Sequence, residues 1–101
     1  MNIWVLGSAE ICSAFALAGV MVRVVESRTE ILSALDELAA REDVRVLAVE
    51  EACAALARDE IDRLKLDFRA PLVVELPGIQ GPAEDRRTAL DLVRQALGIR
   101  L

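Results

Sequence analysis

The chain contains neither histidine nor tyrosine. Histidine is the commonest general base, the usual activator of serine and cysteine nucleophiles and a frequent zinc ligand. The absence of histidine excludes Ser/His and Cys/His catalysis. The two cysteines, Cys12 and Cys53, are too far apart in sequence to form the close Cys pair of a zinc site. We therefore expect a non-catalytic protein that has no metal site and no cofactor.

Two cysteines are also too few for a disulfide framework. We interpret Cys12 and Cys53 as small buried residues on helices in a reducing compartment. The first residues lack the basic segment and long apolar segment of a signal peptide. No apolar stretch approaches the roughly 18 residues that span a bilayer. We therefore expect a cytoplasmic protein without direct membrane insertion.

Clustered positive charge is missing as well. The formal net charge is -5, the pI is close to 4.7, and the 12 Lys and Arg residues are scattered. A nucleic-acid-binding surface needs these residues gathered in one patch, so we expect no nucleic-acid partner. Aromatic residues make up only 3% of the chain and hydrophobic residues 54%, which predicts an aliphatic core. Such a core suits helices on a parallel sheet, whose strands are apolar on both faces.

Four apolar runs alternate with segments that carry apolar residues at helical spacing. The runs predict strands at residues 3–6, 20–25, 44–49 and 72–76, and the intervening segments predict helices at residues 10–18, 27–41, 52–66 and 83–97. Arg23, a charge inside the second run, favours an edge strand. Ser27 and Glu30 have the spacing of a capping box, in which each side chain bonds the backbone N–H of the other residue. Asp59-Glu60 predicts a break in the third helix.

This alternation, with short connections, predicts the fold. Parallel strands joined by right-handed helical crossovers form a sheet with helices on both faces. We expect an α/β chain with a small doubly wound parallel sheet of about four strands, Rossmann-like or receiver-like, plus a C-terminal helix. Residues 1–81 are expected to form the α/β globular part. Residues 82–101 are expected to form the C-terminal helix of the same single domain.

Ligands of doubly wound sheets bind at the carboxyl ends of the strands. The first strand is followed by Gly7-Ser8, a single glycine where a dinucleotide fingerprint needs three, and no P-loop lysine follows. We interpret Ser8 as a helix cap rather than a nucleotide ligand. After the third strand, Glu50 and Glu51 offer two carboxylates for Mg²⁺ or for acid–base chemistry. Adjacent helical residues diverge by about 100°, so we interpret both as the negative first turn of a helix.

Several stretches, spread over nearly the whole chain, are similar to one family. The opening Ile3-Trp4-Val5-Leu6-Gly7 and the following Ala14-Phe15-Ala16-Leu17-Ala18-Gly19-Val20 resemble the start of the F subunit of the rotary V-type and A-type ATPases. Three later stretches fall in that family's order and spacing, namely Val49-Glu50-Glu51, Pro71-Leu72-Val73-Val74-Glu75-Leu76-Pro77 and Leu92-Val93-Arg94-Gln95-Ala96-Leu97-Gly98-Ile99. Ala14 replaces the family's usual glycine, and Gly78-Ile79-Gln80-Gly81 replaces a more polar loop.

The resemblance implies a non-catalytic central-stalk rotor subunit of a prokaryotic V-type or A-type ATPase (ATP synthase). Such a subunit binds the coiled-coil D subunit, binds no nucleotide, and couples or modulates ATP hydrolysis or synthesis and ion transport. The catalytic A and B subunits are further candidate partners. The resemblance also implies a protein that is monomeric when isolated and that lies in the cytoplasm, peripheral to the membrane as part of a membrane-bound complex.

The partner surface implied by the resemblance lies near the end of the chain. A coiled coil would accept the apolar side of the last helix against its own apolar seam. Core packing is favoured for Val93 and Leu97, and partner contact for the Ile79 loop, Arg94, Ile99 and Leu101. The expected interface residues are Ile79, Leu90, Val93, Arg94, Leu97, Ile99 and Leu101.

The alternative from another class is a receiver-like signalling or protein-interaction module without phosphoacceptor chemistry. A signalling receiver needs a carboxylate cluster after its first strand, an aspartate after its third and a lysine near the end of its fifth. In this sequence a single carboxylate, Glu10, follows the first strand, the third ends at Glu50, and no fifth strand with a lysine exists. A nucleotide-dependent transferase is disfavoured because no phosphate-binding loop is present.

Overall fold

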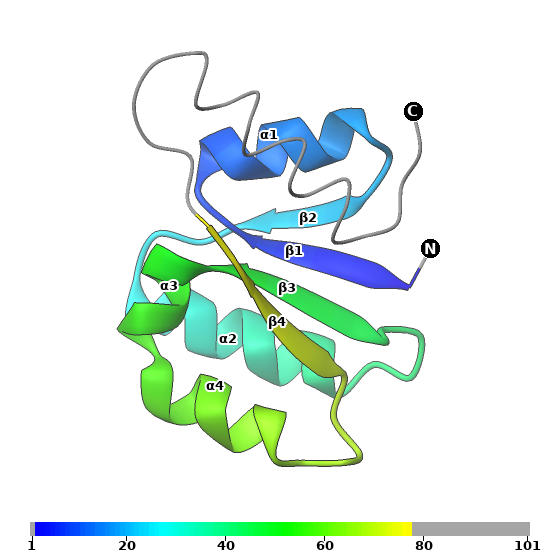
Figure 1. Cartoon of the computed structure of the whole chain (residues 1–101), viewed down its shortest axis with the longest axis vertical. Helices are drawn as coiled ribbons and strands as arrows, with labels where there is room; N and C mark the ends of the chain where they lie inside the picture. Colours follow the sequence, from blue (N-terminus) through cyan, green and yellow to red (C-terminus); the bar gives the residue numbers. More distant parts are fainter. Residues whose placement is uncertain (1, 78–101) are drawn as a thin grey trace.

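The computed structural model describes residues 2–77 of the chain and shows strands and helices in alternation (Figure 1). The elements are β1 (Ile3–Gly7), α1 (Ala9–Leu17), β2 (Met21–Val24), α2 (Arg28–Ala39), β3 (Val46–Glu50), α3 (Glu51–Leu56), α4 (Arg58–Lys65) and β4 (Leu72–Leu76). Each predicted strand is present, and its observed start lies within two residues of the expected one. The predicted last helix lies outside the described residues, as does the division at residue 81.

The four strands form one parallel sheet in the order β2-β1-β3-β4. The two central strands, β1 and β3, carry the most buried residues, including Val5, Leu6 and Leu47. Arg23 lies on β2, which is an edge strand as the internal charge predicted. The predicted α/β fold with a doubly wound parallel sheet is therefore confirmed.

Helices cover both faces of the sheet, which Figure 1 shows between α1 on one side and α2, α3 and α4 on the other. Successive strand residues point to opposite faces, so neighbours such as Val5 and Leu6 belong to different cores. Val5 packs with Ile11 and Phe15 of α1. Leu6 lies in the larger core, which α2, α3 and α4 supply with residues that include Ile31, Leu35, Leu38, Ala54, Ile61 and Leu64.

The helix caps follow the sequence closely, with one exception. The hydroxyl oxygens of Ser8 and Ser27 accept the backbone N–H groups of Ile11 at 3.4 Å and Glu30 at 3.2 Å, so both serines cap helices. The predicted return bond from Glu30 to Ser27 is wrong, because the Glu30 carboxylate accepts the backbone N–H of Glu26 at 3.3 Å. The cap therefore extends one residue further toward the N-terminus than the capping box assumes.

The expected third helix is two helices. Ala57, with φ −136° and ψ 43°, separates α3 from α4, and its side chain is completely buried. The break therefore precedes the predicted one at Asp59-Glu60. These two carboxylates lie in the first turn of α4, where the helix dipole favours negative charge. They mark the start of a helix rather than an interruption.

Candidate functional site

The carboxyl ends of β1 and β3 meet at the centre of the sheet, where the strand order reverses direction. Doubly wound proteins bind their ligands in the crevice at this point, with anionic groups at the N-terminus of the following helix. In this chain β1 ends at Gly7 and β3 ends at Glu50, and Leu6 pairs with Val49 one residue before those ends. A ligand-binding site of a doubly wound domain would therefore lie at this edge of the sheet.

The side chain of Glu50 lies at this position. The residue is only 5% exposed, and its carboxylate oxygens accept the backbone N–H of Ser8 at 3.2 Å and the Ser8 hydroxyl at 3.1 Å. Ser8 is the N-cap of α1, so these donors belong to the helix end that would face a bound anion. The protein's own carboxylate thus occupies the place of a ligand anion.

The expectation that Glu50 and Glu51 share the first turn of a helix is wrong for Glu50. Glu51 is exposed and is the first residue of α3, whereas Glu50 is the last residue of β3 and its side chain makes no cap bond to α3. Glu50 is buried and Glu51 is exposed, so the two carboxylates lie in different surroundings. The missed contact had a signal in the sequence, because an acidic strand end and a Gly-Ser strand end become neighbours once the first and third strands are placed side by side.

Gly7 is needed for close packing at the same point. A Cβ atom at Gly7 would lie 2.5 Å from the Cγ2 atom of Ile11 and 3.1 Å from the Cβ atom of Glu50. Ile11 is itself buried in the α1-side core, so little room exists for either side chain to retreat. The glycine brings the start of α1 against the end of β3, and a phosphate loop is not required to explain it.

Both cysteines are buried free thiols, on α1 and α3, as expected. Burial raises the pKa of the Cys12 thiol. Burial and, after it, the negative charge of Glu50 raise the pKa of Cys53 to about 11. Because the thiolate is the reactive form, both residues are poor nucleophiles at neutral pH. Their thiols contact backbone carbonyl oxygens, Cys12 that of Arg23 at 3.4 Å and Cys53 that of Val25 at 3.8 Å.

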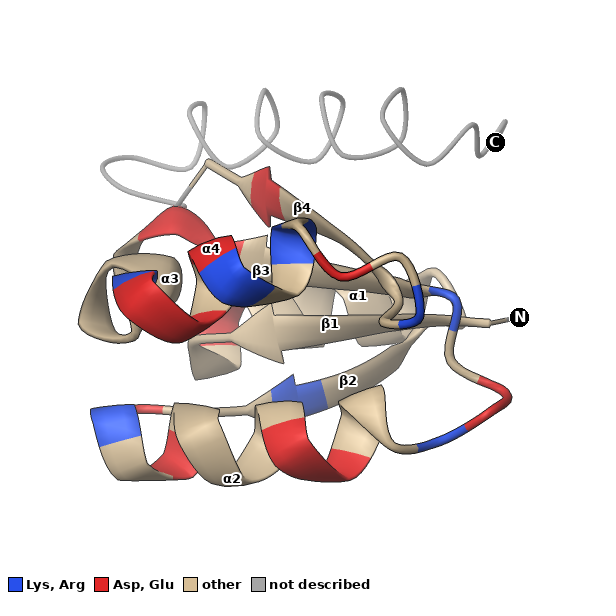
Figure 2. Ribbon diagram, turned by 90° about the horizontal axis from the view of Figure 1, so that it is seen from below, with Lys and Arg blue, Asp and Glu red and all other residues tan. Residues whose placement is uncertain are grey.

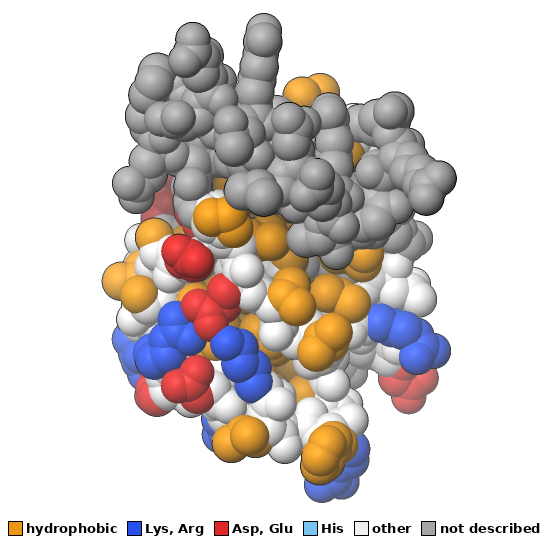
Figure 3. Space-filling model, in the orientation of Figure 1, with side chains coloured by type: hydrophobic (Ala, Val, Ile, Leu, Met, Phe, Trp, Pro, Cys, Tyr) orange, Lys and Arg blue, Asp and Glu red, His pale blue; other side chains and the backbone are white. Residues whose placement is uncertain are grey.

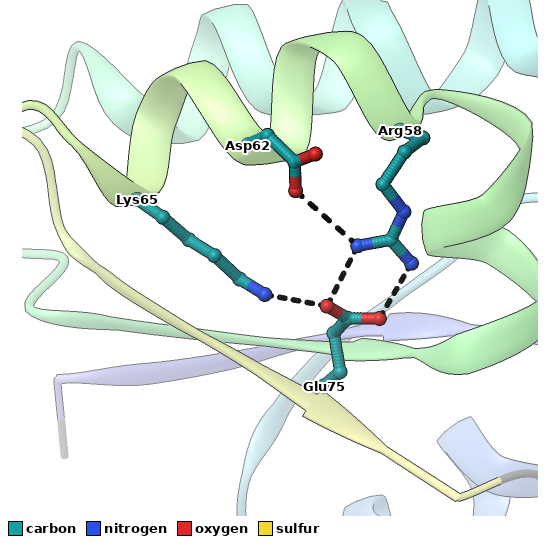
Figure 4. Close-up of polar contacts among 4 residues, drawn as sticks. All are labelled: Arg58, Asp62, Lys65 and Glu75. Carbon is teal, nitrogen blue, oxygen red and sulfur yellow. Dashed lines mark hydrogen bonds and ion pairs between the residues drawn. The ribbon is translucent and has the colours of Figure 1, made fainter.

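A second polar cluster joins α4 to the edge strand β4 (Figure 4). The guanidinium group of Arg58 donates to both carboxylate oxygens of Glu75, at 2.7 and 2.8 Å, and Lys65 donates to the same carboxylate. Asp62 accepts a longer bond from Arg58 at 3.4 Å. The bonds from Arg58 and then Lys65 lower the pKa of Glu75 to about 2. The cluster thus joins α4 to the last part of β4.

Charged and hydrophobic side chains occupy different parts of the surface around β4. In the view of Figure 3, charged side chains of both signs gather on one side, over α4, and hydrophobic side chains lie over the strand. Leu72, at the start of β4, is 64% exposed.

The expected interface residues, from Ile79 to Leu101, all lie outside the described residues, so that surface stays a prediction. Sequence reasoning had not singled out the Arg58–Glu75–Lys65 cluster.

Two further findings concern residues 2–77. No three Asp, Glu, Cys or His side chains in this range are placed to hold a metal ion together. Every helix in the same range falls short of the length and hydrophobicity that crossing a membrane requires.

Fold and site together define a class of protein: a doubly wound α/β domain whose ligand position at the strand-order reversal is filled by its own glutamate. The family model for the ATP synthase (F/14-kDa) subunit matches residues 3–93, and the chain belongs to this family. The chain is 28% identical over 100 residues to the F subunit of the A-type ATP synthase of Methanocaldococcus jannaschii, covering 98% of this chain and 97% of that protein. It is 30% identical over 106 residues to the protein of the same name from Thermococcus kodakarensis, covering 100% and 98%.

Proposed function

We propose that the chain is a non-catalytic central-stalk subunit of a rotary A-type or V-type ATPase. In this role it binds the coiled-coil D subunit and helps to couple or modulate ATP hydrolysis or synthesis and ion transport. The observation that carries the proposal is the family match over residues 3–93, which extends over nearly the whole chain. The Glu50–Ser8 contact supports the non-catalytic part, because it uses the donors that a phosphate would need.

The same role sets the expected surroundings of the protein. It would lie on the cytoplasmic side of the membrane as a peripheral part of the ATPase, with the catalytic A and B subunits as further neighbours. When isolated it would be a monomer. Contact with the coiled coil would come from Ile79, Arg94, Ile99 and Leu101, with Leu90, Val93 and Leu97 shared between this contact and the domain's own core.

Co-expression with the helical-hairpin subunit of the same ATPase tests the proposal. Size-exclusion chromatography with light scattering should give the mass of a one-to-one complex, and the chain alone should give the mass of a monomer. Failure of the pair to co-elute at micromolar concentration would count against the stalk assignment.

A receiver-like module remains the second candidate, because the strand order 2-1-3-4 of the described sheet matches the first four strands of the receiver order 2-1-3-4-5. The structure disfavours phosphoacceptor chemistry at the third strand, since Glu50 is buried and bonded to Ser8. Incubation with radiolabelled acetyl phosphate tests for a phosphoacceptor, and labelling of the chain would contradict the stalk assignment. A stalk subunit and a receiver-like module without phosphoacceptor chemistry both stay unlabelled, and co-elution with the helical-hairpin subunit separates these two.

A further inference from the structure

A groove lies at the amino end of the sheet, opposite the end that holds Glu50. Its walls are the segment that leads from α2 to β3 and the segment that leads from α4 to β4, which Figure 2 shows side by side near the start of β1. The backbone N–H of Leu72 donates to the carbonyl oxygen of Arg45 at 2.9 Å and ties the two segments together. The groove has a volume of about 370 Å³ and is lined by Arg41, Glu42, Arg45, Phe68 and Arg69, together with the smaller apolar residues Ala39, Val44, Ala70 and Pro71.

The charges in this groove differ from those on the rest of the described surface. Each described Lys or Arg outside the groove forms an ion pair with a carboxylate. Arg41, which lines the groove, is also paired. The pairs are Arg23–Glu37, Arg28–Asp59, Arg41–Asp43, Arg58–Glu75, Arg63–Glu60 and Lys65–Glu75. Within residues 2–77, only the guanidinium groups of Arg45 and Arg69 have no carboxylate partner, and both line this one groove. Within the described residues of this acidic chain, the two guanidinium groups without a carboxylate partner thus lie together.

An aromatic side chain lies beside these arginines. Phe68 is completely exposed, in a chain that has only two phenylalanines and one tryptophan. Arginine and aromatic residues are enriched at the centres of protein interfaces, because a planar guanidinium binds carboxylates in pairs of hydrogen bonds and an aromatic ring buries a large area at little entropic cost. The groove therefore combines charge recognition with an apolar anchor.

We propose that this groove docks a carboxylate-rich segment of another protein, with Arg45 and Arg69 as its charge partners and Phe68 as its apolar anchor. Charge complementarity selects this occupant. Two free arginines suffice for a few carboxylates, whereas a nucleic acid or an anionic membrane is bound by a larger field of positive charge. The inference rests on the proposed function only in that the partner is sought among the other subunits of the ATPase.

The test uses the full chain and the rotary ATPase of the same organism assembled without it. The affinity of the wild-type chain for this assembly is compared with that of the double variant Arg45→Gln/Arg69→Gln and of Phe68→Ala. The matched control is Arg28→Gln/Arg63→Gln, which removes the same charge from side chains that are 51% and 65% exposed and paired outside the groove. We expect about tenfold weaker binding at low salt for the groove variants and less than about twofold for the control.

Equal binding of the groove double variant and the wild type overturns the inference, and so does an equal loss in the control. Sedimentation with vesicles of phosphatidylcholine and phosphatidylglycerol tests a membrane as the occupant. Vesicle binding that depends on Arg45 and Arg69, with unchanged binding to the assembly, also overturns the inference. A wild-type chain that does not bind the assembly contradicts the proposed function itself, an outcome that the variants alone cannot produce. Unchanged thermal unfolding of each variant shows that it is folded.

Discussion

Glu50 is the residue on which the interpretation of the site depends. A buried carboxylate is retained only where hydrogen bonds replace its lost hydration, and Ser8 supplies two such bonds from a different strand–helix connection. The contact joins the end of β3 to the start of α1 across the centre of the sheet. It uses polar groups at the edge of the sheet where doubly wound domains bind their ligands.

Replacing Glu50 by alanine should lower the free energy of unfolding by about 2 kcal/mol, because the partly buried N–H and hydroxyl groups of Ser8 lose their carboxylate acceptor. Ser8→Ala, which removes only the hydroxyl, should cost about 1 kcal/mol. Urea unfolding followed by the fluorescence of Trp4, the single tryptophan, measures both. A Glu50→Ala variant as stable as the wild type would show that the contact contributes nothing to the fold.

Substitution of Gly7 or of Gly19 with alanine should destabilise the protein, but for different physical reasons. Gly7→Ala should destabilise the protein by about 1–3 kcal/mol through overpacking against Ile11. Gly19 has open space around it but a φ of 83°, so Gly19→Ala should cost about 1 kcal/mol through backbone strain alone. Ile11→Ala removes the clashing Cγ2 atom. In an Ile11→Ala background the cost of Gly7→Ala in free energy of unfolding should therefore be smaller than in the wild type, and the cost of Gly19→Ala should be unchanged. Additive effects in both pairs would contradict the close approach at Gly7.

At the scale of elements, the Arg58–Glu75–Lys65 cluster holds the edge strand β4 against α4. The carboxyl group of Glu75 has its pKa lowered from 4.5 to about 2 in the folded protein. A lowered pKa means that the cluster stabilises the fold fully above about pH 4.5 and that this contribution is lost as the pH falls toward 2. Because the partners are partly exposed to solvent, the contribution at neutral pH is about 1 kcal/mol.

Glu75→Gln should therefore be less stable than the wild type at pH 7, and the difference should shrink between pH 4.5 and pH 2. Asp62→Asn is the control, since Asp62 is 58% exposed and makes a single longer bond to Arg58. The urea concentration at the midpoint of unfolding, measured at several pH values for each protein, tests this prediction. A difference between Glu75→Gln and the wild type that stays constant down to pH 2 would contradict the assigned cause.

The elements themselves were predictable because their signals are local. Apolar runs, capping serines and Gly19 set the strands and the helix ends, and the charge of Arg23 indicated an edge. The break at Ala57 was misplaced because alanine carries no turn signal, and the burial of Ala57 in the larger core is not visible in the local sequence. The Glu50–Ser8 contact was missed for a related reason. It depends on which strands are neighbours, which is tertiary information.

At the scale of the whole molecule, the described sheet and helices bury two cores of their own, one on each face. A chain that ends at Gly81 should therefore fold but be less stable, and it should bind the coiled-coil subunit that we propose as its partner more weakly. Leu90, Val93 and Leu97 are each worth about 1.5–3 kcal/mol when fully buried, shared between the fold and the interface. Circular dichroism and co-elution with the helical-hairpin subunit measure the two effects. Full partner binding by the shortened chain would exclude residues 82–101 from the interface.

The central claim is that this chain works as a subunit of a rotary ATPase. The most direct measurement is the protein composition of the complex that is purified from the source cells through a tag on this chain, determined by quantitative mass spectrometry. We expect the catalytic A and B subunits in the complex, with this chain and the coiled-coil D subunit in equal amounts. Recovery of the chain alone, or with proteins unrelated to the ATPase, would contradict it.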